Sequence, residues 1–148
     1  MFEAYRNSIP KYQKFSLDEE RRLIAQAKRG DKGKADELIL RHIGFIIFRI
    51  NKIIFPIYRD RFSEDILSQL VFILYDKIQS YDLRYKDREG NPKPVRFSSY
   101  VWKRIDGFII DYLKKELNRD RQQRNLDWER FEKVGSTISS GKLAIRSI

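Results

Sequence analysis

Residues 97–116 read FSSYVWKRIDGFIIDYLKKE, and the helix that they predict organises the rest of the chain. At about 100° per residue, its large apolar side chains gather on one arc of an α-helix, and cations, polar groups and a glycine share the other. The apolar arc holds Val101, Ile105, Phe108, Ile109, Tyr112 and Leu113, and the opposite arc holds Lys103, Arg104, Gly107, Asp111, Lys114, Lys115 and Asn118. The pattern predicts one long, basic amphipathic helix with a face to bury and a face to offer to a negative partner.

The start of this helix combines flat rings with fixed positive charge. Phe97, Tyr100 and Trp102 lie within a turn or two of Lys103 and Arg104. Rings beside cations suit bases that have been unstacked from a duplex. Glycine costs roughly 1 kcal/mol in a helix interior. At Gly107 the bare backbone therefore indicates a place where a phosphate or another helix approaches closely.

The chain before this stretch predicts further helices. Ser16 is an N-cap for a helix that begins at Leu17, and Gly30-Asp31 ends that helix and starts the next. Residues 36–55 are apolar around most of a helix, which is typical of the centre of a bundle, and Pro56 closes this segment. Ser63 is an N-cap for a helix over residues 64–79.

Phe72 is an anomaly in the 64–79 helix, because a large aromatic side chain is centred on its polar face. Such a ring indicates a contact with a partner, or a neighbouring loop that covers it. Its companions on this face are Asp65, Ser68, Gln69 and Asp76.

Residues 83–96 read as a loop that turns at Gly90-Asn91. Its cations are either solvated or a second phosphate contact.

After residue 116, Arg119, Arg121 and Arg124 continue the basic tract. Residues 125–134 predict a short separate helix, and residues 135–141 read as a linker. The expected organisation is an arm (1–15), an all-α core of about four to five helices (16–124) and a tail (125–148).

The bulk composition narrows the choice of partner. The 148 residues carry a net charge of +10 and no cysteine. This excess of positive charge favours a polyanion as the partner: nucleic acid is the first choice and an anionic membrane the second. No run of ~18 apolar residues and no signal peptide is present, so we expect a soluble, cytoplasmic protein.

The residues do not favour catalysis. His42 is the only histidine, so a metal site of the usual His/Cys kind is not expected. Asp106, Asp111 and Glu116 are spaced by five residues, which turns each about 140° from the last around one helix, so they cannot converge on one ion. We expect no enzyme activity, no metal and no cofactor.

Several of these pieces together resemble bacterial sigma factors. Phe97-Ser98-Ser99-Tyr100, Arg104-Ile105, Gly107 and Ile110 to Lys114 are similar to the helix of the core (region 2) domain that melts and recognises the minus-ten promoter element. The closest likeness is to the motility, extracytoplasmic-function and competence-type branches. The resemblance implies that this helix binds the non-template strand, with Phe97, Tyr100, Trp102, Lys103, Arg104, Tyr112, Lys114, Lys115, Arg119, Arg121 and Arg124 as contacts.

The 64–79 helix resembles the sigma surface that docks on the clamp helices of core RNA polymerase. Asp65 matches an acidic position of that surface, and Ser80-Tyr81-Asp82 matches its closing aromatic-aspartate pair. The resemblance implies that Asp65, Ser68, Gln69, Phe72 and Asp76 bind polymerase.

The likeness covers roughly residues 17–124 and has departures. Ser68-Gln69 replaces the usual Gln-Glu pair, and Lys103-Arg104 replaces a Trp-Trp pair, with Trp102 one step earlier. The second DNA-reading domain of typical sigma factors does not follow. It is truncated, naturally absent or supplied in trans by a second subunit, and an anti-sigma factor is a further partner that the family implies.

Two other functions stay open. A basic helical nucleic-acid-binding regulator that acts without RNA polymerase would bind nucleic acid tightly alone. An amphipathic membrane-surface module would use the same tryptophan and tyrosine side chains.

Overall fold

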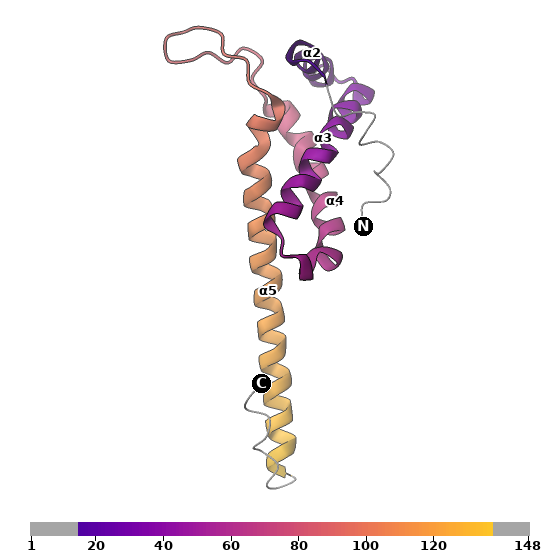
Figure 1. Cartoon of the computed structure of the whole chain (residues 1–148), viewed down its shortest axis with the longest axis vertical. Coiled ribbons are helices and arrows are strands. Elements are labelled where there is room, and N and C mark those ends of the chain that lie inside the picture. The colour runs from indigo at the N-terminus through magenta and orange to yellow at the C-terminus, as the bar shows by residue number, and fades with distance from the viewer. Residues whose placement is uncertain (1–14, 138–148) are drawn as a thin grey trace. The chain divides into compact units, whose positions relative to one another are not determined.

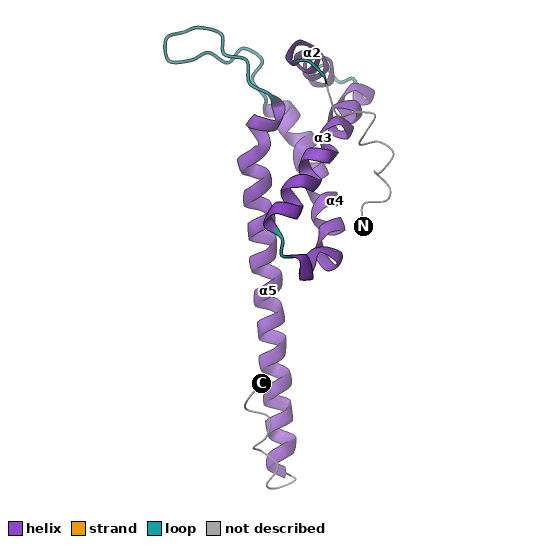
Figure 2. Ribbon diagram, viewed as in Figure 1, coloured by secondary structure: helices purple, strands orange, loops and turns teal. Residues whose placement is uncertain are grey.

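The structure is a computed structural model that describes residues 15–137 and the side chains of residues 15–134. Over this range it is all-helical, as predicted, with one isolated bridge between Lys86 and Pro92. The helices are α2 (Leu17–Lys28), α3 (Lys32–Ile53), α4 (Pro56–Ser80) and α5 (Phe97–Thr137) (Figure 1, Figure 2). Most of the predicted arm and most of the predicted linker lie outside the described residues.

Local capping chemistry sets the first helix boundaries, as predicted. The backbone N–H of Glu19 donates to Ser16 Oγ at 3.1 Å. Gly30 then takes a positive φ of 102°, which glycine adopts without strain. Asp31 caps α3 by accepting a hydrogen bond from the backbone N–H of Lys34 at 3.2 Å.

The start of α4 differs from the prediction. The helix begins at Pro56, seven residues before Ser63, which is fully buried inside it. Proline is favourable at the first helical position, because its missing N–H has no partner there in any helix. The same residue therefore follows the end of α3 and opens α4.

α3 packs against both α2 and α4, which also meet each other. Its inward positions are almost fully buried: Leu38, Ile39, Ile43, Ile46 and Ile50. Full burial of such a side chain contributes about 1.5–3 kcal/mol. α3 therefore lies at the centre of the bundle, as predicted, although one side of it reaches the surface, where Phe48 is 51% exposed.

The contacts group into two compact units, residues 1–110 and residues 111–148, and the division falls inside α5. In the first unit, α5 buries Phe97, Val101, Ile105 and Ile109. The separate helix predicted over 125–134 is instead a continuation of α5, because residues 117–125 contain no glycine or proline to break it. α5 carries nine Lys/Arg against seven Asp/Glu, so its basic excess is small.

Candidate functional site

Phe97 does not lie on the predicted DNA-contacting face, and this corrects its assignment. Its side chain is fully buried, with its ring centroid 5.0 Å from that of His42 and 6.2 Å from that of Tyr81. An aromatic ring at the start of α5 can pack in the hydrophobic core or contact a ligand, and the sequence does not distinguish the two. Phe97 anchors the helix start on α3 and α4.

Tyr100 is half-buried, with its ring fixed from several sides. Its hydroxyl shares a hydrogen bond of 2.8 Å with Ser80 Oγ. Lys77 Nζ lies 5.5 Å from the ring centroid, and Tyr81 packs edge-on at 5.3 Å. These contacts hold the ring at the junction of α4 and α5, where part of it reaches the surface.

Trp102 is 42% exposed and held in one orientation. Its Nε1–H donates to Asp106 Oδ2 at 3.0 Å, and the Arg49 guanidinium lies 4.8 Å from the ring centroid. Arg49 in turn donates two hydrogen bonds to Asp106, at 2.9 and 2.7 Å. Phe45 packs against the ring edge-on at 5.4 Å. Because these contacts already fix the indole, it would lose less conformational entropy on stacking with a ligand.

Lys103 and Arg104 follow Trp102 and are exposed. Neither forms an ion pair with any residue that the structure describes. A Cβ added at Gly107 would meet no atom within 4 Å apart from the local backbone of α5, so the helix is open there, as predicted. Two cations and an open stretch of backbone thus lie within about a turn and a half of a fixed indole.

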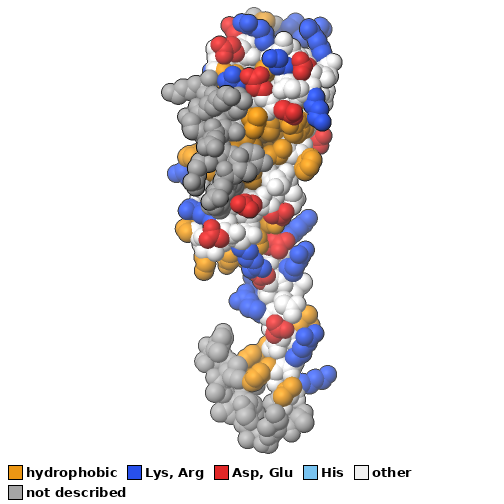
Figure 3. Space-filling model, turned by 90° about the vertical axis from the view of Figure 1, so that its right-hand side faces the viewer, with side chains coloured by type: hydrophobic (Ala, Val, Ile, Leu, Met, Phe, Trp, Pro, Cys, Tyr) orange, Lys and Arg blue, Asp and Glu red, His pale blue; other side chains and the backbone are white. Residues whose placement is uncertain are grey.

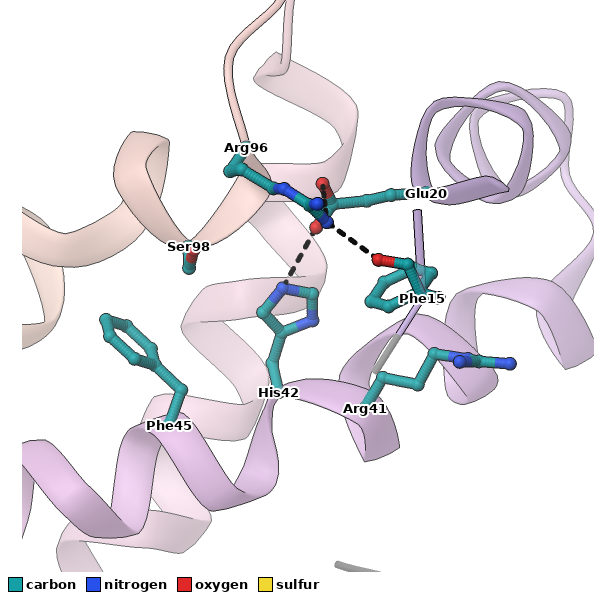
Figure 4. Close-up of a pocket in the computed structure, with 7 residues that line it drawn as sticks. All are labelled: Phe15, Glu20, Arg41, His42, Phe45, Arg96 and Ser98. Carbon is teal, nitrogen blue, oxygen red and sulfur yellow. Dashed lines mark hydrogen bonds and ion pairs between the residues drawn. The ribbon is translucent and has the colours of Figure 1, made fainter. Parts of the chain in front are cut away.

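A cavity of about 500 Å³ lies between α2, α3 and the start of α5 (Figure 4). Its lining consists of Phe15, Glu20, Arg41, His42, Phe45, Arg96 and Ser98. Phe45 lines this cavity and also contacts Trp102, so the cavity adjoins the indole cluster. Aromatic rings and guanidinium groups are a suitable lining for a planar, negatively charged ligand.

Buried polar groups form one wall of this cavity. Glu20 Oε1 lies 3.3 Å from His42 Nε2, and Glu20 Oε2 lies 3.8 Å from the Arg96 guanidinium. His42 Nδ1 is 2.7 Å from the carbonyl oxygen of Leu38, which can only accept, so Nδ1 carries a proton. His42 is therefore a structural residue with fixed partners.

The predicted contacts in the second unit lie along one exposed helix (Figure 3). Tyr112 is half-buried, whereas Lys114, Lys115, Arg119, Arg121 and Arg124 are exposed. Arg119 pairs with Glu116 at 3.5 Å. No side chain described between residues 111 and 134 is buried. Figure 3 shows lysine and arginine side chains along this part of α5, with acidic side chains between them.

The predicted polymerase-binding residues share one exposed face of α4. They are Asp65, Ser68, Gln69, Phe72 and Asp76. Phe72 is 73% exposed, so no described loop covers it. Gln69 Nε2 donates to Asp65 Oδ2 at 3.0 Å, a normal distance for residues four apart on a helix.

Sequence reasoning missed the residues that position the exposed rings. Arg49 interrupts an apolar run and Asp106 interrupts the amphipathic pattern, but 57 residues separate the partners. The sequence did contain one signal: Arg49 and Asp106 carry opposite charges and lie on the inward sides of two predicted helices, as the partners of a buried ion pair would. Arg96 and Glu20 were missed for the same reason.

Comparison with protein-family models, curated proteins and solved structures gave no match. Among the described residues, no group of three or more metal-ligating side chains comes together. Within the same range, no helix has the length and apolar character needed to cross a bilayer.

Proposed function

We propose that the chain is a sigma-factor-like transcription initiation factor. The exposed face of α4 binds core RNA polymerase, and the start of α5 holds the non-template strand of an opened minus-ten promoter element. The chain acts by binding, without covalent chemistry, in the cytoplasm. Its role is to lower the cost of opening DNA, since each base stacked on an aromatic ring contributes roughly 1–3 kcal/mol.

The observation that carries the proposal is the arrangement around Trp102. Arg49 and Asp106 fix the indole, and 42% of it stays exposed beside two cations that pair with no described carboxylate. A core tryptophan would be covered, whereas this ring is held by contacts with an ion pair that connects α3 to α5 and still stays partly exposed. A base can stack on the exposed part of the ring while its phosphates meet Lys103 and Arg104.

The adjoining cavity supports base capture. Its volume of about 500 Å³ is within the range of small-ligand sites, which is about 300–1,000 Å³. In the proposal, a splayed base enters between Phe15 and Phe45. Arg41 and Arg96 meet the sugar-phosphate chain.

The exposed face of α4 supports a protein partner. Phe72 is a large exposed ring surrounded by polar and acidic side chains, which is the usual anatomy of an interface anchor. The acidic rim formed by Asp65 and Asp76 suits a basic partner surface.

Co-purification with bacterial core RNA polymerase tests the α4 surface. The wild-type chain is expected to associate, and Asp65→Arg and Phe72→Ala each to reduce the association at least about tenfold, the usual effect of removing an interface anchor. Phe55→Ala is the matched control, because Phe55 is 67% exposed at the start of α4 and lies outside the proposed surface. Equal losses in Phe55→Ala and Phe72→Ala would contradict the assignment.

Binding to a single-stranded promoter oligonucleotide tests Trp102. Trp102→Ala is expected to weaken binding about 5- to 150-fold, which corresponds to the loss of 1–3 kcal/mol of stacking. Trp128→Ala is the matched control, since Trp128 is the other tryptophan and also donates to a carboxylate four residues on, Glu132, at 2.9 Å. Unchanged binding in Trp102→Ala, with the fold intact, would count against base capture.

The exposed cations from Lys114 to Arg124 favour one alternative, a nucleic-acid-binding regulator that acts without polymerase. It predicts tight, salt-sensitive binding to DNA by the chain alone. A wild-type chain that binds DNA tightly and does not associate with polymerase would establish this alternative.

A further inference from the structure

The segment between α4 and α5 is a protruding hairpin-like loop with an excess of exposed cations (Figure 1, teal in Figure 2). We call residues 83–95 the charged hairpin. It belongs to the first compact unit, and it is separate in sequence from both the α4 surface and the Trp102 cluster.

Side chains from the bundle hold both ends of the charged hairpin. Arg21 donates to the carbonyl oxygen of Leu83 at 2.7 Å, and the Tyr81 hydroxyl donates to the carbonyl oxygen of Val95. Just beyond, Arg96 donates to the carbonyl oxygen of Phe15 at 2.9 Å. The two ends of the hairpin are thus fixed to α2 and to the C-terminal end of α4.

Backbone hydrogen bonds order the rest of the hairpin. The N–H of Lys93 donates to the carbonyl oxygen of Tyr85 at 3.0 Å, and that of Asp87 donates to Asn91 at 2.9 Å. The turn closes where Gly90 donates to Asp87 at 3.0 Å with a φ of 82°. The Asp87 carboxylate accepts the N–H of Asn91 at 2.8 Å. The turn is therefore centred on Arg88 and Glu89 and closed by Gly90, slightly earlier than the predicted position at Gly90-Asn91, and the segment is an ordered structure.

The charges of the hairpin divide into two groups. Its four cations are exposed and form no ion pair with any described residue: Arg84, Lys86, Arg88 and Lys93. Two of the nearby carboxylates are engaged by the backbone, because Asp82 accepts the N–H of Arg84 at 2.8 Å and Asp87 accepts that of Asn91. The cations are held out to solvent, and only Glu89 lacks such a structural bond.

We propose that the charged hairpin binds the phosphate backbone of double-stranded DNA. Cations presented on an ordered loop lose less entropy on binding than cations on a free one, and each phosphate contact releases condensed counterions. A single strand calls for a series of stacking rings, whereas Tyr85 is the only large exposed apolar side chain here. A membrane surface would need several large apolar side chains to insert, whereas the hairpin exposes only Tyr85.

This contact goes beyond the proposed function, which assigns the opened strand to α5 and polymerase to α4. The hairpin would hold duplex that has not been melted, independently of sequence. It requires neither polymerase nor base capture, so it can be tested on the chain alone.

The test is the salt dependence of binding to a short duplex, measured by fluorescence anisotropy on the full chain between about 50 and 200 mM salt. The variant replaces Lys86, Arg88 and Lys93 with glutamine. Its slope of log K against log salt is expected to be shallower by about 2.7, or about 0.9 for each phosphate that the variant no longer neutralises. Circular dichroism checks the fold, which exposed substitutions should leave intact.

The matched control replaces Arg22, Arg29 and Lys32 with glutamine, which removes the same charge from exposed positions on α2, at its C-cap and at the start of α3. Its slope is expected to change by less than about 0.9, the value for a single phosphate. Equal flattening in both variants would show that net charge alone drives binding, and would overturn the proposal. So would an unchanged slope in the hairpin variant.

A single-stranded oligonucleotide provides the third arm. The hairpin variant is expected to lose more affinity for duplex than for single strand, and the opposite order would overturn the assignment to duplex. The Trp102→Ala measurement and the polymerase co-purification change other residues, and they measure binding to single-stranded DNA and to polymerase, whereas the hairpin proposal is decided by binding to duplex. If the hairpin does not bind duplex, the proposed function is therefore unaffected. If the proposed function is wrong, the hairpin proposal is likewise unaffected.

Discussion

Among single residues, Gly107 is the one whose substitution should have opposite effects on stability and on DNA binding. Gly107→Ala adds a methyl group where no atom outside the local helix backbone lies within 4 Å. Because alanine is the better helix former, thermal or denaturant unfolding should show a stability gain of about 0.5–1 kcal/mol. If DNA approaches the bare backbone here, the same variant should bind the single-stranded oligonucleotide more weakly. A variant that is stabilised and binds normally would remove Gly107 from the interface.

Tyr81 makes a second prediction at this scale, on pH. Burial raises the pKa of its phenol above the ordinary 10.0, although nearby Arg21 acts in the opposite direction. The folded chain then holds this proton to higher pH than the unfolded chain does. The stabilisation is fully present below about pH 10 and is lost as the pH rises through the raised pKa, by at most about 1.4 kcal/mol per pH unit.

Denaturant unfolding at a series of pH values above 9 measures this effect. Tyr81→Phe should flatten the alkaline fall in stability relative to wild type. An identical alkaline slope in wild type and Tyr81→Phe would mean that this phenol does not contribute.

At the scale of elements, local signals in the sequence were sufficient only where the chemistry is local. Ser16, Gly30 and Asp31 set helix boundaries through bonds to residues a few positions away, and all three were predicted. Pro56 was interpreted as a stop, but proline both ends one helix and opens another. Ser63 looks like a cap in the sequence, yet its burial depends on packing that local signals do not encode.

The candidate site shows the same limit. The exposed face around Phe72 follows from helical periodicity, and it was predicted. The burial of Phe97 and the ion pair of Arg49 with Asp106 depend on which helices meet, over 57 residues of sequence in the second case. Periodicity assigns a residue to a face without identifying what covers that face.

α5 makes a prediction at the element scale. Residues 97–110 bury four apolar side chains, whereas no described side chain from 111 to 134 is buried. An unpacked helix is only marginally stable in water. Hydrogen exchange measured by mass spectrometry should therefore be faster in 111–134 than in 97–110. Equal protection in the two parts would mean that the second part is covered by a partner, such as another copy of the chain.

For the molecule as a whole, we propose a division of labour between elements. The exposed face of α4 carries acidic and aromatic side chains suited to a protein. The start of α5 carries a fixed indole, two exposed cations and an adjoining cavity suited to opened DNA. The charged hairpin carries cations suited to duplex. Among the described elements, none combines all three sets of side chains.

The most direct test of this claim is site-specific photo-crosslinking in a complex of the chain with core RNA polymerase and promoter DNA. A photo-reactive amino acid replaces Phe72, Lys103 or, as a control, Ile57, which is 80% exposed. We predict that position 72 crosslinks to polymerase, position 103 to the non-template strand, and position 57 to neither. Crosslinks from position 72 to DNA, or none from position 103 to either strand, would contradict the account.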